Sequence, residues 1–99
     1  MAAFERIKNK RFFYKMGVMC GELLYHTYKF DDFGKMVEEA QKISDKYNDM
    51  QYCTFVIQAF KDDSYDFEKS CFFQTRLPVY DIETKKDNIM KQILRNSES

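Results

Sequence analysis

The sequence contains no tryptophan, one proline, one histidine and only three glycines, and each shortage argues against a class of structure or chemistry. Gly17, Gly21 and Gly34 match neither glycine-rich pattern that cradles phosphate groups, GxxxxGK or GxGxxG, which argues against nucleotide binding. No stretch rich in Pro, Gly and Ser divides the 99 residues. We therefore expect a single domain over residues 1–99, with a frayed tail at 96–99.

The histidine and cysteine content also argues against the common metal and nucleophile sites. His26 stands alone, and Cys20, Cys53 and Cys71 contain no CxxC pair, whereas zinc sites need clustered thiolates and imidazoles. No activating motif surrounds any of the thiols, so a Cys–His catalytic pair is not expected. The acidic run 62–68 lacks the glycine and glutamate positions of a calcium-binding EF-hand loop. We predict no metal, no cofactor and no enzymatic activity.

Long hydrophobic segments are missing as well. The start of the chain has charge where a signal peptide needs an apolar core, and Lys15 interrupts the apolar run from Phe12 to Cys20. An odd number of cysteines among apolar neighbours predicts buried free thiols in a reducing compartment. These features together predict a cytoplasmic protein that makes no membrane contact.

Net charge is absent too, because sixteen basic residues balance sixteen acidic ones. A neutral chain has no overall field that would draw it to nucleic acid. The charges are unevenly distributed, however. Residues 1–30 carry six bases against two acids, and residues 31–70 carry five bases against ten acids.

Apolar residues, by contrast, make up 44% of the chain and include ten Phe and seven Tyr, enough to build a core. Residues 33–47 follow the three-and-four spacing of one helix face, and an alternation of apolar and polar residues follows. Asp31 and Asp32 stand where an N-cap belongs. We predict a helix over residues 32–46 and a strand over 51–61.

The N-terminal third fits both a helix and a pair of strands. Gly17 and Gly21 would each cost a helix interior about 1 kcal/mol relative to Ala, and the Phe, Tyr, Val and Thr around them favour strands. We predict a hairpin of strands 11–19 and 23–30. The alternative is one long helix over residues 5–27.

The C-terminal third shows a polar turn at 62–66 and then a fourth strand at 69–80, whose Pro78 places its end at an edge or a bend. Thr84 is the expected cap of a last helix, whose predicted buried residues are Ile89, Met90, Ile93 and Leu94. The order ββαββα predicts an α+β fold. We expect a small two-layer sandwich, a mainly antiparallel sheet of about four strands with two helices on one face, as in ferredoxin-like domains. The long-helix alternative would be ααββα.

A basic and aromatic segment near the start is the best candidate for contact with nucleic acid. Cations that neutralise phosphates are interleaved there with rings that stack on bases, as in single-strand binders. The predicted contact residues are Lys8, Lys10, Arg11, Phe12 and Tyr14. Residues 69–73 match only fragments of the RNP1 motif, so nucleic-acid binding is the alternative function.

Large apolar residues occur on both sides of the predicted strands, whereas the helices would cover one side. The second side therefore predicts a protein partner or a second copy of the chain, with Phe13, Tyr25 and Phe72 as candidate interface residues. We predict a non-enzymatic protein-interaction module, a small regulator or inhibitor that binds a partner protein or forms a homodimer. High Phe, Tyr, Lys, Asp and Asn content is common in small phage and mobile-element proteins.

Overall fold

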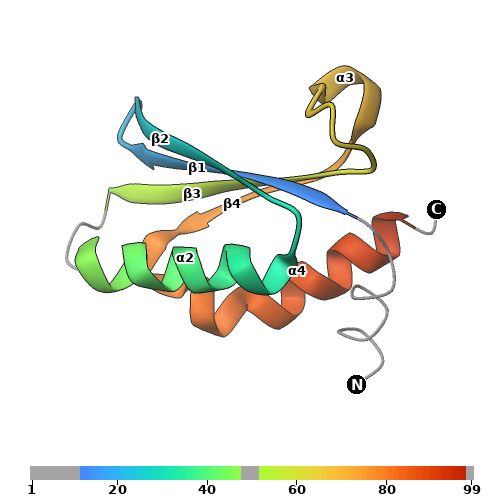
Figure 1. Ribbon diagram of the computed structural model, residues 1–99. Helices are drawn as coiled ribbons and strands as arrows, with labels where there is room; N and C mark the ends of the chain where they lie inside the picture. The colour runs from blue at the N-terminus through green and yellow to red at the C-terminus, as the bar shows by residue number, and fades with distance from the viewer. Residues whose placement is uncertain (1–11, 48–51, 98–99) are drawn as a thin grey trace.

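The computed structural model describes residues 12–47 and 52–97 of the chain. Four strands form one sheet, as the sequence predicts. The elements in chain order are β1 (Phe13–Cys20), β2 (Leu23–Phe30), α2 (Phe33–Tyr47), β3 (Cys53–Phe60), α3 (Phe67–Ser70), β4 (Cys71–Pro78), the 3₁₀ turn η1 (Val79–Asp81) and α4 (Ile82–Ser97). The fold is therefore α+β (Figure 1).

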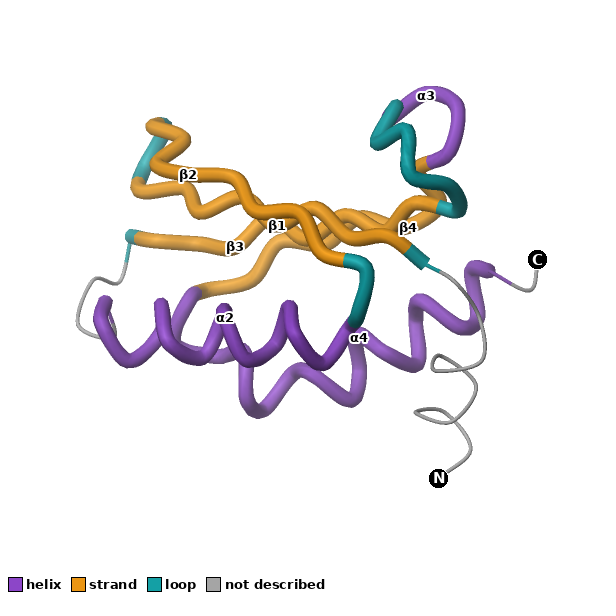
Figure 2. Tube along the Cα trace, in the orientation of Figure 1, coloured by secondary structure: helices purple, strands orange, loops and turns teal. Residues whose placement is uncertain are grey.

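Antiparallel pairing joins the strands in the spatial order β2-β1-β3-β4, so β2 and β4 are the edges. Helices α2 and α4 pack against one face of the sheet, and the segment that contains α3 rises from the other face (Figures 1 and 2). The predicted two-layer sandwich is confirmed. The described part of the chain follows the order ββαβ(α)βα, which begins with a hairpin and differs from the βαββαβ order of ferredoxin-like domains.

The N-terminal third forms the predicted hairpin, and the long-helix alternative is wrong for the residues that the structure describes. β1 and β2 pair in antiparallel register along both strands. Gly21 turns the chain with a φ of +66°, a backbone conformation that glycine adopts without a Cβ clash. The Gly21 N–H donates to the carbonyl oxygen of Tyr52 at 3.1 Å, which ties the turn to the start of β3.

Alternate strand residues face the helices and form the core, because successive side chains of a strand point to opposite faces. In β1, Tyr14, Met16 and Val18 are at most 3% exposed. The helices contribute a buried stripe each, formed by Phe33, Met36, Ala40 and Ile43 of α2 and by Ile89, Met90, Ile93 and Leu94 of α4. The predicted buried set of the last helix is therefore confirmed.

The start of α2 confirms the predicted cap, whereas the start of α4 differs from the prediction. The Gly34 N–H donates to Asp32 Oδ1 at 3.3 Å, as an N-cap carboxylate requires. Thr84 lies inside α4, and its hydroxyl donates to the carbonyl oxygen of Asp81 at 3.2 Å. The helix begins earlier because η1 already bends the chain after Pro78.

The polar turn after β3 contains a helical turn that the sequence pattern did not predict. Asp66 caps α3, accepting the N–H groups of Glu68 and Lys69 on its carboxylate. At the other end of the chain, α4 continues to Ser97, so part of the predicted frayed tail is helical.

The prediction of three free thiols is wrong for two of them. Cys20 and Cys53 are direct partners in the pairing of β1 with β3, their Cα atoms are 4.2 Å apart, and a disulfide joins them. Cys71 is free and half-buried, and its thiol donates to the carbonyl oxygen of Phe73 at 3.4 Å. The cysteines therefore no longer support the predicted reducing compartment.

The segment of residues 61–70, which contains α3, covers one end of the face opposite the helices (Figure 2). The centroid of the Tyr65 ring lies 5.4 Å from that of Phe60 and 6.3 Å from that of Phe13. Phe60 is only 1% exposed as a result. Residues 61–70 of the same chain thus cover Phe13 and Phe60 on this face, where the sequence analysis had expected an external partner.

Candidate functional site

The residues predicted to contact nucleic acid do not form an accessible group in the described part of the chain. Lys8, Lys10 and Arg11 lie outside the described residues. Phe12 and Tyr14 are 6% and 1% exposed, because both side chains pack into the core. Base stacking needs an accessible ring face, and neither ring presents one in the described part of the chain.

The three predicted interface residues have different environments. Phe13 is half-buried against the Tyr65 ring, and Phe72 is half-buried with its ring centroid 5.4 Å from that of Phe12. Tyr25 is 61% exposed on the edge strand β2. Of the three, Tyr25 alone is exposed, and Phe13 and Phe72 belong to the packing of the domain.

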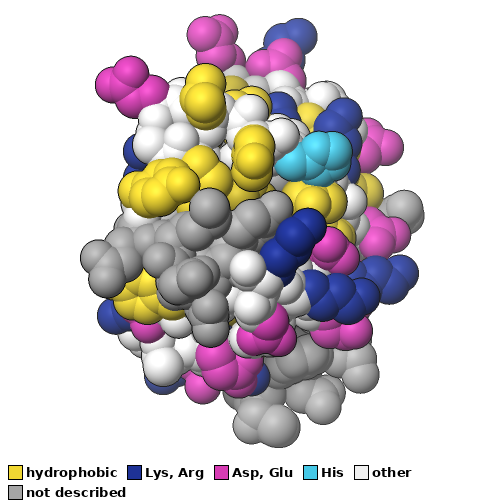
Figure 3. Space-filling model, turned by 90° about the vertical axis from the view of Figure 1, so that its left-hand side faces the viewer, with side chains coloured by type: hydrophobic (Ala, Val, Ile, Leu, Met, Phe, Trp, Pro, Cys, Tyr) yellow, Lys and Arg dark blue, Asp and Glu magenta, His cyan; other side chains and the backbone are white. Residues whose placement is uncertain are grey.

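Large exposed apolar side chains gather at the end of the molecule where the β1–β2 hairpin turns. Their exposed fractions are 59–72%, and they are Leu23, Leu24, Tyr25 and Tyr52, which we call the hairpin-end patch. Figure 3 views the molecule from this end and shows hydrophobic side chains beside the single histidine. Concentrated exposed apolar groups are a mark of interaction surfaces.

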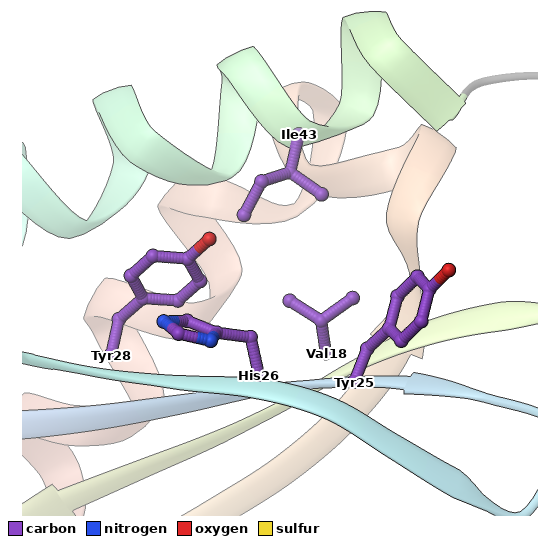
Figure 4. A pocket seen from close by; sticks show the side chains of 5 residues that line it. All are labelled: Val18, Tyr25, His26, Tyr28 and Ile43. Atoms are coloured by element: carbon purple, nitrogen blue, oxygen red, sulfur yellow. The ribbon is translucent and has the colours of Figure 1, made fainter.

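A bulge in β2 sets the direction of the side chains beside this patch. The register shifts between Val18 and Met19 of β1, so β2 has an additional residue, Tyr25, at this point. Tyr25 and His26 consequently both lie on the side that faces α2 (Figure 4). A groove of about 260 Å³ opens between β2 and α2, lined by Val18, Tyr25, His26, Tyr28 and Ile43.

The open face of the sheet, opposite the helices, carries every Lys and Arg of the four strands. These residues are Lys15, Lys29 and Arg76, and the strands contain no Asp or Glu. Lys15 and Lys29 are direct partners in the antiparallel register, an arrangement in which like charges destabilise the pair. In the described part of the chain, no carboxylate forms an ion pair with Lys15 or Arg76.

An open hollow of about 280 Å³ lies on the same face. Its lining residues are Lys15, Gly17, Met19, Leu24, Thr27, Val56, Gln58 and Arg76. A Cβ at Gly17 would lie 3.3 Å from Leu24 Cδ1, so the missing side chain lets Leu24 lie across the sheet. The hollow thus places aliphatic groups next to cations.

Tyr14 and Asp62 are among the groups whose pKa values are shifted by their local surroundings. The buried Tyr14 hydroxyl has no hydrogen-bond partner among the described residues, and burial, with a smaller contribution from the charge of Asp32, raises the pKa of Tyr14. On the surface, the Ser64 hydroxyl donates to Asp62 at 2.6 Å and the Ser64 N–H at 3.0 Å, which lowers the pKa of the Asp62 carboxyl. Both groups lie outside the linings of the groove and the hollow.

Within residues 12–47 and 52–97, no three His, Cys, Asp or Glu side chains come close enough to hold a metal ion. No helix in these ranges is long and apolar enough to cross a lipid bilayer. The chain matches no family model, and neither a curated protein nor a solved structure is detectably similar to it. Functional inference therefore rests on the surface geometry.

The sequence analysis included Tyr25 among the candidate interface residues, but it did not include Leu23, Leu24 or the cations of the open face. Leu23 and Leu24 fit a strand pattern, and their exposure depends on the edge position of β2 and on its bulge. The sequence could have predicted that Lys15 and Lys29 lie on the face opposite the core, because both occupy positions that alternate with buried residues in the predicted strands. The pairing of these two lysines depends on the hairpin register.

Proposed function

We propose that this protein is a non-enzymatic interaction module that binds a partner protein through the hairpin-end patch. The observation that supports the proposal is the exposure of Leu23, Leu24 and Tyr25, at 59–72%, in consecutive positions of an edge strand. Burying one such side chain contributes roughly 1.5–3 kcal/mol. A partner that covers the patch would therefore gain several kcal/mol.

The groove beside the patch adds shape to this surface. Tyr25 borders both the patch and the groove, and His26 and Tyr28, whose ring centroids are 4.5 Å apart, form part of the groove wall. An aromatic anchor next to a pocket is the usual arrangement at the centre of a protein interface. A small module of this kind suits a regulator or inhibitor, and its composition fits a phage or mobile-element origin.

Nucleic-acid binding is the less favoured function, because base stacking needs accessible rings beside cations. Phe12 and Tyr14 are buried, and the rings of Phe13 and Tyr65 pack together on the open face. The exposed aromatic residue Tyr25 follows two exposed leucines, Leu23 and Leu24, in the chain. These placements favour a protein partner.

The test compares two exposed aromatic positions at opposite ends of the sheet. Tyr25→Glu introduces a charge into the patch, whereas Phe67→Glu does so in α3, where the ring is 54% exposed. We expect Tyr25→Glu to weaken binding of the partner captured by the wild-type protein about tenfold or more, the loss typical of an interface anchor. Phe67→Glu should bind normally, and both variants should melt like the wild type.

Calorimetric titration with the purified partner measures both affinities. Equal affinities for the two variants would remove the hairpin-end patch from the interface. Binding that survives removal of protein but depends on nucleic acid in the extract would replace this function with the alternative one.

A further inference from the structure

The distribution of charge between the two faces of the molecule is uneven. The strands contain three cations and no acidic residue, and the cations all lie on the open face. The acids of the described chain belong to the helices, turns and loops instead. The strands therefore present only positive charge on the open face (Figure 1), although Asp62, Asp63, Asp66 and Glu68 of the α3 segment border it and the whole chain is neutral.

The pairing of Lys15 with Lys29 opposes the stability of the free protein. Their side chains emerge directly opposite each other on β1 and β2, where like charges repel. Lys29 Nζ lies 4.8 Å from the centroid of the Tyr65 ring, and this cation–π contact offsets part of the repulsion between the two lysines. Lys15 has no ion-pair partner among the described residues. Two like charges placed directly opposite each other, with only part of their repulsion offset in the free protein, are typical of a functional site.

Arg76 completes the set on the opposite side of the hollow. It pairs with Val56 on β3, and Val56 in turn pairs with Gly17 on β1, so the cations flank the aliphatic floor. Neighbouring strands are about 4.8 Å apart, so the distance from β2 to β4 across three gaps is roughly 14 Å. An extended segment of about four or five residues is long enough to cross it.

We propose that the open face is a second binding surface, which takes an acidic protein segment that crosses the strands. Carboxylates of the segment lie against Lys15, Lys29 and Arg76, and an apolar side chain between them enters the hollow above Gly17 and Val56. Complementarity of charge commits the face to an anionic occupant. A protein segment fits better than a nucleic acid, because none of the described residues that line the hollow is aromatic and could stack on a base.

A labelled peptide of alternating Glu and Leu is the probe, and fluorescence anisotropy measures its binding to the full chain. We expect the affinity for the peptide to fall as the salt concentration rises, because attraction between exposed charges contributes most of the binding free energy. Lys15→Glu and Arg76→Glu should each weaken it about tenfold or more. Lys42→Glu and Lys91→Glu are matched controls, since both lysines are exposed on the helices and the charge change is the same.

The outcomes separate this surface from the hairpin-end patch. Tyr25→Glu should leave peptide binding unchanged, so the failure of one proposal does not imply the failure of the other. Equal losses in the open-face and control variants, or no binding at all, would overturn the proposal. Tighter binding of a single-stranded oligothymidylate than of the peptide would assign the face to nucleic acid and would also overturn it.

A second measurement needs no ligand. Lys15→Gln removes the like-charge pair, so the thermal midpoint of the free protein should rise at low salt and the gain should shrink at high salt. Lys42→Gln is the control and should not change the midpoint. An unchanged midpoint in Lys15→Gln would remove the argument that the pair is kept at a cost to stability, and with it the proposal.

Discussion

Among single residues, Tyr14 combines a fully buried ring with an unsatisfied hydroxyl. The side chain is 1% exposed, its ring centroid lies 5.8 Å from that of Phe33, and none of the residues that the structure describes forms a hydrogen bond with its hydroxyl. An unsatisfied buried polar group costs about 1–3 kcal/mol, whereas the ring contributes apolar burial. The hydroxyl and the ring therefore act on stability in opposite directions.

Tyr14→Phe is accordingly expected to stabilise the protein by about 1 kcal/mol, because it keeps the ring and removes the unsatisfied group. Urea denaturation at neutral pH measures the change. Tyr28→Phe is the control, since the Tyr28 ring is only half-buried. A loss of stability in Tyr14→Phe would show that the hydroxyl makes a favourable interaction in solution.

The raised pKa of Tyr14 also predicts how stability responds to alkaline pH. The unfolded chain ionises Tyr14 near its ordinary pKa of 10.0, while burial keeps the hydroxyl protonated in the folded state. The contribution of protonated Tyr14 to the free energy of unfolding is thus fully present below pH 10 and is lost as the pH rises above it. Tyr14→Phe should reduce this loss, and Tyr65, whose pKa burial also raises, should leave a remainder. An identical alkaline profile in both proteins would contradict the assignment.

Between elements, the disulfide is the strongest link that the sequence analysis did not anticipate. Cys20 ends β1 and Cys53 begins β3, and the bond closes a loop over a sequence separation of 33 residues. β2 and α2 lie inside this loop. The bond therefore restricts the unfolded chain over about a third of its length.

Reduction should lower the free energy of unfolding by about 3–4 kcal/mol, the value that loop-closure entropy gives for a loop of this size. Chemical denaturation with and without dithiothreitol measures it, and a Cys20→Ser/Cys53→Ser variant, which has no bond to reduce, is the control. Without reductant, a thiol reagent should label Cys71 alone after denaturation. Labelling of all three cysteines would show that the pair is a dithiol in the protein as isolated.

At the scale of the whole molecule, the edge position of β2 leaves the hairpin-end patch open to a second copy. The neutral chain creates no net repulsion between copies, so self-association is compatible with its charge. Lys29 and the bulge in β2 oppose a long regular pairing of two edges. We therefore expect copies to meet by packing of their patches and not by extension of the sheet.

Sedimentation equilibrium at micromolar concentration should show a dimer of the 12.0 kDa chain. Leu23→Glu should shift it to monomer without changing the circular dichroism spectrum, because Leu23 is 72% exposed and its loss leaves the core intact. Tyr80→Glu, at a position that is 56% exposed in η1, is the comparison. A wild-type protein that stays monomeric would contradict the predicted dimer and would leave other proteins as the partners of the hairpin-end patch.

Local periodicity was enough to predict the strands, both long helices and the two-layer arrangement. The spacing of apolar residues reflects which face of each element is buried, and the hairpin at Gly21 and the cap at Asp32 depend on nearby residues. The same local information also predicted the buried stripe of α4 correctly. Element ends were less well determined, because η1 and α3 depend on a few side-chain contacts such as the Asp66 cap.

Contacts between distant segments required the folded chain. The disulfide, the Lys15–Lys29 pair and the cover of Phe13 by Tyr65 each join residues whose proximity follows from strand register and from the path of one loop. A shift of register by one residue would turn each strand side chain to the other face, so composition and spacing do not determine these neighbours. The candidate surfaces arise at this level, because an edge strand is exposed only when the order of the sheet leaves it without a second neighbour.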